Sequence, residues 1–326
     1  MSLKRLLTST FIVSIVILTS IGVASAHFTM LFPKGMDVTP QDYIAEIGET
    51  KTILIVWGHP FEHILFDMTS TPEVGVRDPE GNIKILTPTE ITIEGKKAYK
   101  VSFTVDKMGD WVIYAKYKDE DEKLVDYVKI IIHCGEEAWF GWDAEVRQKA
   151  EIMPYTRPYG IEEGFVFTGK ALFNGEALAN ADVEIEKYHT KDVADEIVEK
   201  AEKMFSYDPP MMFTRVTKTN GNGEFTYTLD EPGIWFIGAY GPEVDGFTQR
   251  GIIIVPVLQA FPPEEKATAE KAEVPSAALE ELKSKIKSLE DEIATLKTQK
   301  KSPGFGVLGA VIGLIVVAYL IKRRKE

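Results

Sequence analysis

Cysteine is almost absent from this sequence, with only Cys134 among 326 residues. A single cysteine excludes an internal disulfide, so the fold depends on packing and on any metal that the protein binds. Histidine is also scarce, at five residues, and acidic residues outnumber basic ones by 50 to 37. The negative balance suits soluble cations, and we expect no nucleic-acid partner because such a surface repels phosphate.

Common catalytic motifs are missing as well. The chain has no glycine-rich phosphate loop, no nucleophile elbow and no HExxH motif. Without a recognisable acid, base or nucleophile set, we assign no catalytic residue and no organic-cofactor site. The sequence therefore favours a protein that is not an enzyme.

The N-terminal 26 residues have the pattern of a secretory signal. Lys4 and Arg5 precede an apolar core from Phe11 to Leu18, and Ala24-Ser25-Ala26 supplies a small-residue cleavage site. An uncleaved N-terminal anchor is the alternative interpretation. Cleavage after residue 26 would make His27 the first residue of the mature protein.

The C-terminal end has the pattern of a membrane anchor. Phe305 to Ile321 is a run of 17 uncharged residues, and the basic cluster Lys322 to Lys325 follows directly. We predict a transmembrane helix over 303–321 and a cytoplasmic tail over 322–326, although a buried core helix is the rival interpretation. The part facing outward then carries a net charge of −18, once +2 for the signal and +3 for the tail are removed from the total of −13.

Short strands dominate the region from Ala45 to His133. Apolar and polar residues alternate over Tyr99–Val105 and Trp111–Tyr117, and turn signals such as Asp78–Gly81 separate the strands. Several short strands at this spacing are typical of an antiparallel β-sandwich. The pattern then lapses into an aromatic, proline-rich stretch, which we interpret as a domain boundary.

A second set of strands follows this boundary. Asn174-Gly175 and Asn220–Gly223 are hairpin signals, because Asn and Gly tolerate positive φ. Between Asp192 and Phe205 apolar residues recur at helical spacing, which predicts an amphipathic surface helix. The fold class is therefore an all-β ectodomain of two tandem antiparallel β-sandwiches of immunoglobulin-like type, followed by a stalk and one transmembrane helix.

A short coiled coil is predicted between the ectodomain and the membrane. From Leu279 to Leu296 apolar residues fall at spacings of three and four, with mostly β-branched residues at a and Leu at d, which favours a parallel homodimer. Gly309 and Gly313 form a second weak dimerisation signal, and a monomeric stalk remains open. The predicted organisation is signal 1–26, metal-binding sandwich 27–135, linker 136–160, second sandwich 161–258 with a helical insertion at 191–205, linker 259–275, stalk 276–300, span 303–321 and tail 322–326.

Two of the five histidines lie close together in the stretch WGHPFEH. His59 and His63 follow the apolar run Thr52–Trp57, and Glu62 lies between them. Pro60 can start a helical turn, which would place both imidazoles on one side. A mature N-terminal His27 would add two nitrogens from one residue, because its α-amine and imidazole can close a chelate ring.

Such a nitrogen-rich set predicts a divalent transition metal rather than calcium or magnesium. An amine with two or three imidazoles suits Ni, Co, Cu or Zn, and the spacing alone does not choose among them. His133 ends the strand Tyr127–Ile132 and could approach the same edge, whereas His189 is expected at the surface. Any one of these histidines could instead be structural. The candidate metal ligands are His27, His59, Glu62, His63 and His133.

Three segments resemble an exported family that accompanies energy-coupling-factor nickel and cobalt uptake transporters. They are His27-Phe-Thr-Met-Leu-Phe-Pro33, Gly58-His-Pro-Phe-Glu62 and Pro154-Tyr-Thr-Arg-Pro-Tyr-Gly160. The likeness spans about Ala26 to Val257, and its second half is also similar to transthyretin-like and carboxypeptidase-regulatory-like sandwiches.

The resemblance implies an extracytoplasmic protein that binds Ni(II) or Co(II) and passes it to a membrane permease. His27, His59 and Glu62 match the expected ligand positions, whereas His63 is a candidate from spacing alone. Two other functions remain open. One is a Cu(II) site of the histidine-brace kind, for copper handling or oxidative polysaccharide cleavage, and the other is a structural or adhesive role at the cell surface.

Overall fold

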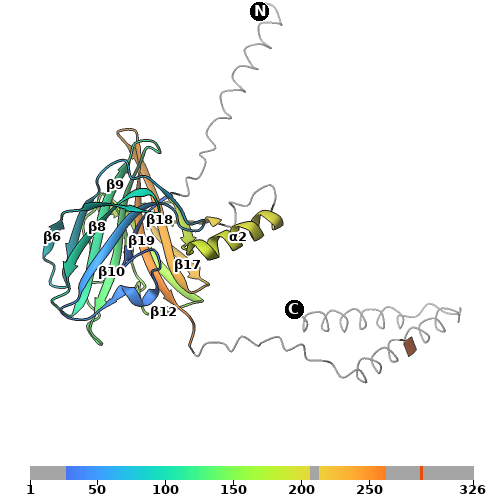
Figure 1. Cartoon of the computed structure of the whole chain (residues 1–326), viewed down its shortest axis with the longest axis horizontal. Helices are drawn as coiled ribbons and strands as arrows, with labels where there is room; N and C mark the ends of the chain where they lie inside the picture. Colours follow the sequence, from blue (N-terminus) through green and yellow to red (C-terminus); the bar gives the residue numbers. More distant parts are fainter. Residues whose placement is uncertain (1–26, 206–212, 262–286, 289–326) are drawn as a thin grey trace, which may run out of the picture. The chain divides into compact units, whose positions relative to one another are not determined.

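The computed structural model describes residues 27–205, 213–261 and 287–288. One compact unit extends to Pro263 and contains nearly all of these residues (Figure 1). The predicted signal, the stalk (apart from residues 287–288), the span and the tail lie outside the described residues, as does most of the 259–275 linker.

A ten-stranded sheet, here called the central sheet, runs through the compact unit. Its main path is β16 (Arg215–Lys218), β15 (Asp182–Lys187), β18 (Gly233–Val244), β19 (Phe247–Leu258), β10 (Leu124–Cys134), β9 (Gly109–Asp119), β5 (Glu73–Arg77) and β6 (Ile83–Leu86). Two short strands, β12 (Ile161–Glu162) and β2 (Ile44–Ala45), pair with β19 and β10.

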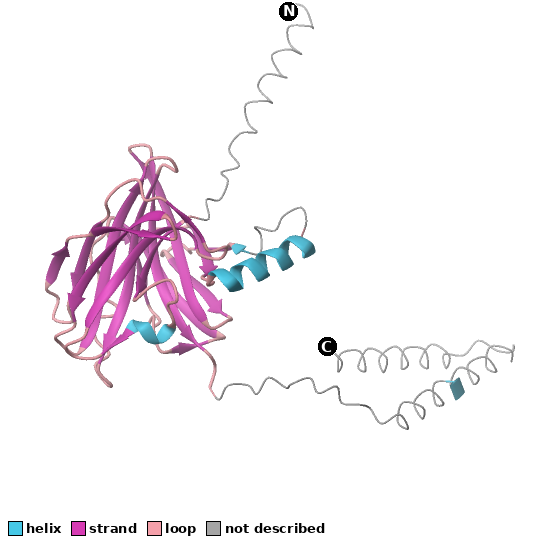
Figure 2. Cartoon of the chain, in the orientation of Figure 1, coloured by secondary structure: helices cyan, strands magenta, loops and turns pink. Residues whose placement is uncertain are grey.

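Strands make up most of the unit (Figure 2), and two smaller sheets accompany the central sheet. The N-terminal sheet has the order β1 (Phe28–Pro33), β3 (Thr50–His59), β8 (Lys96–Thr104) and β7 (Thr89–Ile93), and β4 (Ile64–Phe66) pairs with β3. The C-terminal sheet has the order β11 (Ala150–Pro154), β13 (Phe165–Phe173) and β14 (Glu176–Ala177), and β17 (Glu224–Leu229) pairs with β13. A 3₁₀ turn spans Pro40–Tyr43.

The central sheet is buried on both faces in its middle strands. Successive side chains of a strand point to opposite faces. Ile252 and Ile254 of β19 accordingly join the core formed with the N-terminal sheet, whereas Ile253 and Val255 join the core formed with the C-terminal sheet. Every residue of β10 is buried, as expected for a strand covered on both sides. The unit is therefore three layers of sheet rather than two sandwiches in series.

The prediction of a β-rich ectodomain is confirmed, but the expectation of purely antiparallel, separate sandwiches is wrong. β10 from the first half pairs in parallel with β19 from the second, starting at Leu124 opposite Thr248. The expected linker also contains β11, which pairs with β13. Alternation along single strands carries no signal for such distant pairing, since the two partners are more than 100 residues apart.

The predicted helix is present. α2 spans Lys191–Met204 and follows β15, with Ala194 and Ala201 buried. Charged residues occupy the other face, where Lys200 and Lys203 pair with glutamates one turn earlier. These exposed ion pairs contribute little to stability, because water screens them.

Candidate metal centre

His27 and His59 lie together at one edge of the N-terminal sheet. Strand β1 pairs with β3 so that Phe28 is opposite Gly58, which brings the preceding His27 to the level of His59. Their ring centroids are 4.5 Å apart, with an angle of 42° between the planes. Residues 32 positions apart in the chain are therefore neighbours, as a shared site requires.

Gly58 is required by the close approach of the next strand. A Cβ at this position would lie 1.9 Å from the carbonyl oxygen of Ile64 on β4. The hairpin between β3 and β4 closes tightly at this point, and it carries His59 to the end of β3. A larger residue at position 58 would push β4 and the site apart.

Aromatic rings support the two imidazoles. Phe66 meets the ring of His27 edge-on, with centroids 4.7 Å apart, and lies 5.5 Å from the ring of His59. Trp57 contacts His27 from a centroid distance of 5.5 Å. This apolar wall restricts the rotation of both imidazoles, so a ligand would meet rings that are already oriented.

Two carboxylates face the imidazoles. Glu62 Oε2 lies 2.5 Å from His59 Nδ1, and Glu122 Oε1 lies 3.5 Å from His27 Nδ1. The contact to Glu62 engages Nδ1 of His59, so Nε2 is the ring nitrogen that a metal could bind. Glu122 was not among the ligands predicted from the sequence. The sequence signal for Glu122 is the acidic turn Asp119–Glu122. Such a turn is typical of any solvent-exposed hairpin, so it does not indicate a ligand.

The surroundings favour an uncharged His27. Burial lowers the pKa of its imidazole, and the neighbouring His59 and Arg250 lower it further, while Glu122 and Asp119 oppose the shift. A metal binds the unprotonated ring, so a lowered pKa keeps the ligand form available at mildly acidic pH.

His63 does not share this site. Its Nδ1 lies 2.9 Å from the backbone carbonyl oxygen of His189, and its Nε2 lies 3.0 Å from Glu94 Oε1. The prediction of a helical turn is wrong, because residues 60–63 form the tight loop of the β3–β4 hairpin. His63 has φ of 51° and its side chain is buried. The left-handed residue reverses the chain, so four-residue spacing does not put both rings on one side.

His133 is also remote from the pair. It lies at the end of β10 opposite Asp110, whose Oδ1 is 2.7 Å from His133 Nδ1, and its ring stacks on Tyr159. Glu122, beside His27, lies two residues before the other end of β10, which begins at Leu124. Leu124 and His133 are nine positions apart along the extended strand, or about 30 Å. The expectation that His133 approaches the same edge is therefore wrong.

His189 is buried, which corrects the expectation of a surface residue. Its Nδ1 lies 3.0 Å from the carbonyl oxygen of Phe61, and burial lowers the pKa of its imidazole. Together with His63, it ties the β3–β4 loop to the segment before α2.

The described residues contain no group of three or more His, Cys, Asp or Glu side chains arranged to hold a metal ion. The edge thus supplies two imidazoles, with the carboxylates of Glu62 and Glu122 beside them. A free α-amine at His27, after cleavage, is the donor that the sequence predicts.

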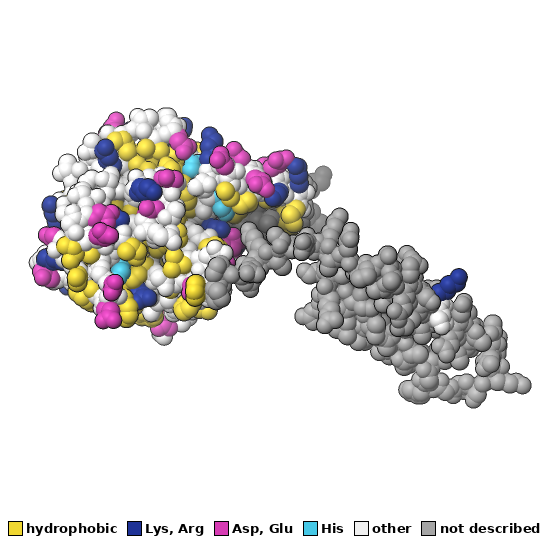
Figure 3. Space-filling view, turned by 60° about the horizontal axis from the view of Figure 1, so that its bottom comes forward, with side chains coloured by type: hydrophobic (Ala, Val, Ile, Leu, Met, Phe, Trp, Pro, Cys, Tyr) yellow, Lys and Arg dark blue, Asp and Glu magenta, His cyan; other side chains and the backbone are white. Residues whose placement is uncertain are grey.

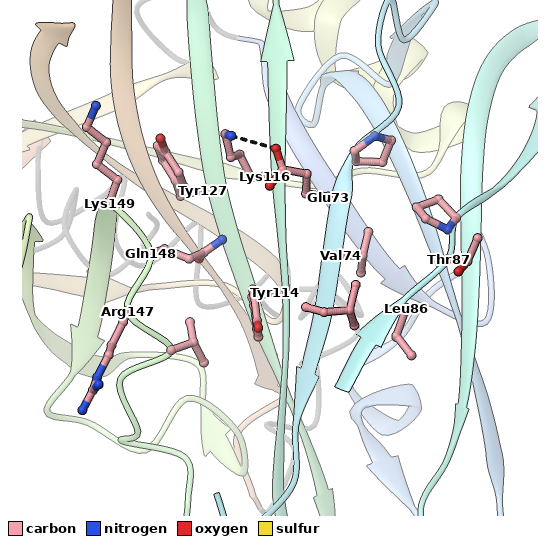
Figure 4. Close-up of a pocket in the computed structure, with 14 residues that line it drawn as sticks. Glu73, Val74, Leu86, Thr87, Tyr114, Lys116, Tyr127, Arg147, Gln148 and Lys149 are labelled. Carbon is pink, nitrogen blue, oxygen red and sulfur yellow. Dashed lines mark hydrogen bonds and ion pairs between the residues drawn. The ribbon is translucent and has the colours of Figure 1, made fainter. Parts of the chain in front are cut away.

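A wide cleft of about 820 Å³ lies elsewhere, against β5 and β9 (Figure 4). Tyr114, Lys116 and Arg147 are among its lining residues, and Lys116 is paired with Glu73 at 2.8 Å. No histidine lines it. On the face shown in Figure 3, acidic and basic side chains are interspersed, so the negative charge is not gathered in one patch there.

The fold and the C-terminal sequence define a mostly β-stranded protein with a surface anchor at its C-terminal end. Residues 302–324 match the PGF-CTERM motif, a C-terminal surface anchor of archaea, so the protein is membrane-associated and extracellular. In the part of the chain with described coordinates, no helix is long and apolar enough to cross a bilayer. The predicted span at 303–321 overlaps the motif.

The chain belongs to the family described as "Domain of unknown function (DUF4198)", whose model matches residues 24–242. No curated protein matches the sequence.

Several solved structures share a low level of likeness. A bacterial ice-binding adhesin is 10% identical with a TM-score of 0.22, over 72% of this chain and 64% of its own. Salmonella alpha-2-macroglobulin is 11% identical with a TM-score of 0.23, over 72% and 15%. A DUF4785 family protein of Legionella pneumophila is 8% identical with a TM-score of 0.27, over 71% and 57%. These values support no inference about function.

Proposed function

We propose that this protein is a membrane-anchored, extracytoplasmic metal-binding protein that captures Ni(II) or Co(II) for delivery to an uptake permease. The observation that carries the proposal is the contact between the rings of His27 and His59, 4.5 Å apart at one sheet edge. His27 is also the residue that signal cleavage would leave at the N-terminus.

The available donors fit a late first-row divalent ion. The α-amine and ring of His27, with Nε2 of His59, would supply three nitrogens, and imidazole suits Ni, Co, Cu and Zn. Glu62 would orient His59 from its 2.5 Å contact. Glu122, 3.5 Å from His27 Nδ1, is placed to add an oxygen ligand or to accept a hydrogen bond.

The anchor motif supports a role at the membrane. A tethered metal-binding unit would keep its ion beside a permease and raise the effective concentration of the donor. A single span with a cytoplasmic tail, and a parallel homodimer through the stalk, belong to the same proposal. The resemblance to nickel and cobalt uptake accessories suggests the choice of ion and of partner.

Titration calorimetry of the ectodomain beginning at His27, with Ni, Co, Cu and Zn, tests the proposal. The matched control carries one extra residue before His27, which converts the α-amine to an amide and blocks the chelate. We expect the extended form to lose affinity for Ni and Co, and His133→Gln to bind as tightly as the wild type. Equal binding by the extended form would show that His27 does not chelate the ion through its α-amine.

A copper site is the second candidate. The same three nitrogens could form a T-shaped plane, and in the Irving–Williams order Cu(II) binds such a set more tightly than Ni(II). Binding of copper alone, with oxidative cleavage of a polysaccharide when O₂ and a reductant are supplied, would favour this function. If none of the four ions binds, or shifts the thermal unfolding temperature, a structural role at the cell surface takes precedence.

A further inference from the structure

A buried arginine contacts the first described residue of the chain. Arg250 on β19 is fully buried, and it donates from Nε and Nη2 to the two carboxylate oxygens of Asp126, at 2.8 and 3.0 Å. The same guanidinium donates to the hydroxyl of Tyr240 at 2.8 Å and to the backbone carbonyl oxygen of His27. The planar guanidinium of arginine has donors in fixed directions and can bind several acceptors at once, whereas the ammonium of lysine lacks this geometry.

Asp126 holds the next part of the same segment. Its Oδ2 accepts from both the backbone amide and the hydroxyl of Thr29, each at 2.9 Å. Phe28 lies between His27 and Thr29 in the chain, and the centroid of its ring is 4.5 Å from Cζ of Arg250. Three successive residues, 27 to 29, therefore contact one ion pair.

The ion pair joins the two halves of the chain. Asp126 on β10 and Arg250 on β19 are partners in the parallel register, 124 residues apart. Tyr240 links Arg250 to a third strand, because its hydroxyl also donates to Glu184 on β15 at 2.6 Å. The second half of the chain thus reaches the edge where His27 and His59 meet.

Stability alone is a poor explanation for this pair. Removing two charges from water is costly, and well-packed apolar residues of similar size often give an equally stable core. The contacts to His27, Phe28 and Thr29 are what apolar replacements would not reproduce. They fix both the position and the direction of the N-terminal segment.

We infer that Arg250 and Asp126 are positioning residues, which hold the mature N-terminus against His59 so that its nitrogens converge on one ion. The inference rests on the proposed function, and it gives the second half of the chain a part in metal binding. The N-terminal segment has its own ladder with β3, but a ladder alone does not fix the residue that precedes its first pair, which is His27.

Arg250→Lys is the informative variant, because it keeps the charge beside Asp126 and loses the planar guanidinium. Arg215→Lys is the matched control, since Arg215 pairs with Asp230 at another edge of the central sheet and is partly exposed. Cu(II) is the probe ion, because electron paramagnetic resonance reports how many nitrogens bind it. For the mature ectodomain with Arg250→Lys we expect a 10- to 100-fold lower affinity and fewer coordinated nitrogens. Arg215→Lys should change neither.

Hydrogen exchange of the Thr29 amide gives a readout that needs no metal. It should be faster in Arg250→Lys than in the wild type. If that variant does not fold, Asp126→Asn replaces it, with the same expectations. A folded variant with wild-type affinity, nitrogen count and Thr29 exchange would overturn the inference. If the wild type binds no ion, the proposed function fails. In that case the exchange of the Thr29 amide still tests the positioning role, and equal exchange in the variant and the wild type would refute it.

Discussion

His59 and His63 are four residues apart, yet they lie in regions with opposite properties. At the sheet edge, His59 has one ring nitrogen bound to Glu62 and the other left for a ligand. In the interior, both ring nitrogens of His63 lie beside protein oxygens, from His189 and Glu94. A histidine whose nitrogens are both engaged cannot bind a metal without breaking those contacts. The availability of ring nitrogens, rather than spacing, separates a candidate ligand from a structural residue.

Replacing the edge histidine should give the largest effect. His59→Ala removes a proposed ligand, so we expect the affinity for Ni(II) or Cu(II) to fall by about 100-fold or more, beyond what loss of a supporting residue costs. The thermal unfolding temperature of the metal-free ectodomain should change little, because His59 is only half-buried. Calorimetric titration measures the first quantity and calorimetric scanning the second. An unchanged affinity would place the site elsewhere.

The interior histidine should show the reverse pattern. His63→Ala leaves the His189 carbonyl and Glu94 without their partner, and we expect a loss of about 1–3 kcal/mol in the free energy of unfolding. The metal affinity of the folded variant should equal that of the wild type. Urea denaturation measures the stability. A loss of affinity as large as that of His59→Ala would contradict the comparison.

The interior also contains a buried carboxyl group, that of Glu186. Burial raises the pKa of Glu186 to about 8, and the donor contact from Thr214 only partly opposes the shift. Because the folded-state pKa lies above the unfolded one, its contribution to stability is full below about pH 4.5 and is lost as the pH rises toward 8.

Glu186→Gln should remove that pH dependence. Between pH 5 and pH 8 the wild type should lose up to about 1.4 kcal/mol of unfolding free energy per pH unit from this group, and the variant should not. Denaturation curves at several pH values measure the slope. Identical slopes for both proteins would show that Glu186 is ionised in the folded state.

The smallest expected effect is the change in the free energy of unfolding as the pH is lowered. The pKa values of His27 and His189 are both lowered by burial, so the unfolded state binds more protons than the folded state below about pH 6.5. The free energy of unfolding of the metal-free protein should therefore fall as the pH drops through that range. His27→Gln and His189→Gln should each remove part of the fall.

Bound Ni(II) should affect only one of these contributions. An ion on His27 competes with protons there, so it should steepen the loss of stability in acid for the wild type and for His189→Gln, but not for His27→Gln. Unfolding followed by circular dichroism, with and without the ion, measures the difference. Equal steepening in all three proteins would mean that the ion binds away from His27.

The sequence predicted local structure well, since that structure depends on nearby residues. Alternation identified strands such as β8 and β9, and the 3.6-residue period identified α2. The C-terminal anchor followed from an apolar run with a basic end, and the PGF-CTERM match confirms an anchor there. The proximity of His27 and His59 was predicted from the expected cleavage site and the WGHPFEH stretch together.

Other features depended on contacts between distant residues, which a single sequence does not reveal. The parallel pairing of β10 with β19 sets Asp126 beside Arg250, and neither residue stands out in its own strand. The left-handed backbone at His63 turned its ring toward Glu94. Local pattern thus determined which segments are strands and where the chain is anchored. Only the tertiary structure decided which histidines meet and what holds them, because side-chain direction follows from strand register and turn geometry.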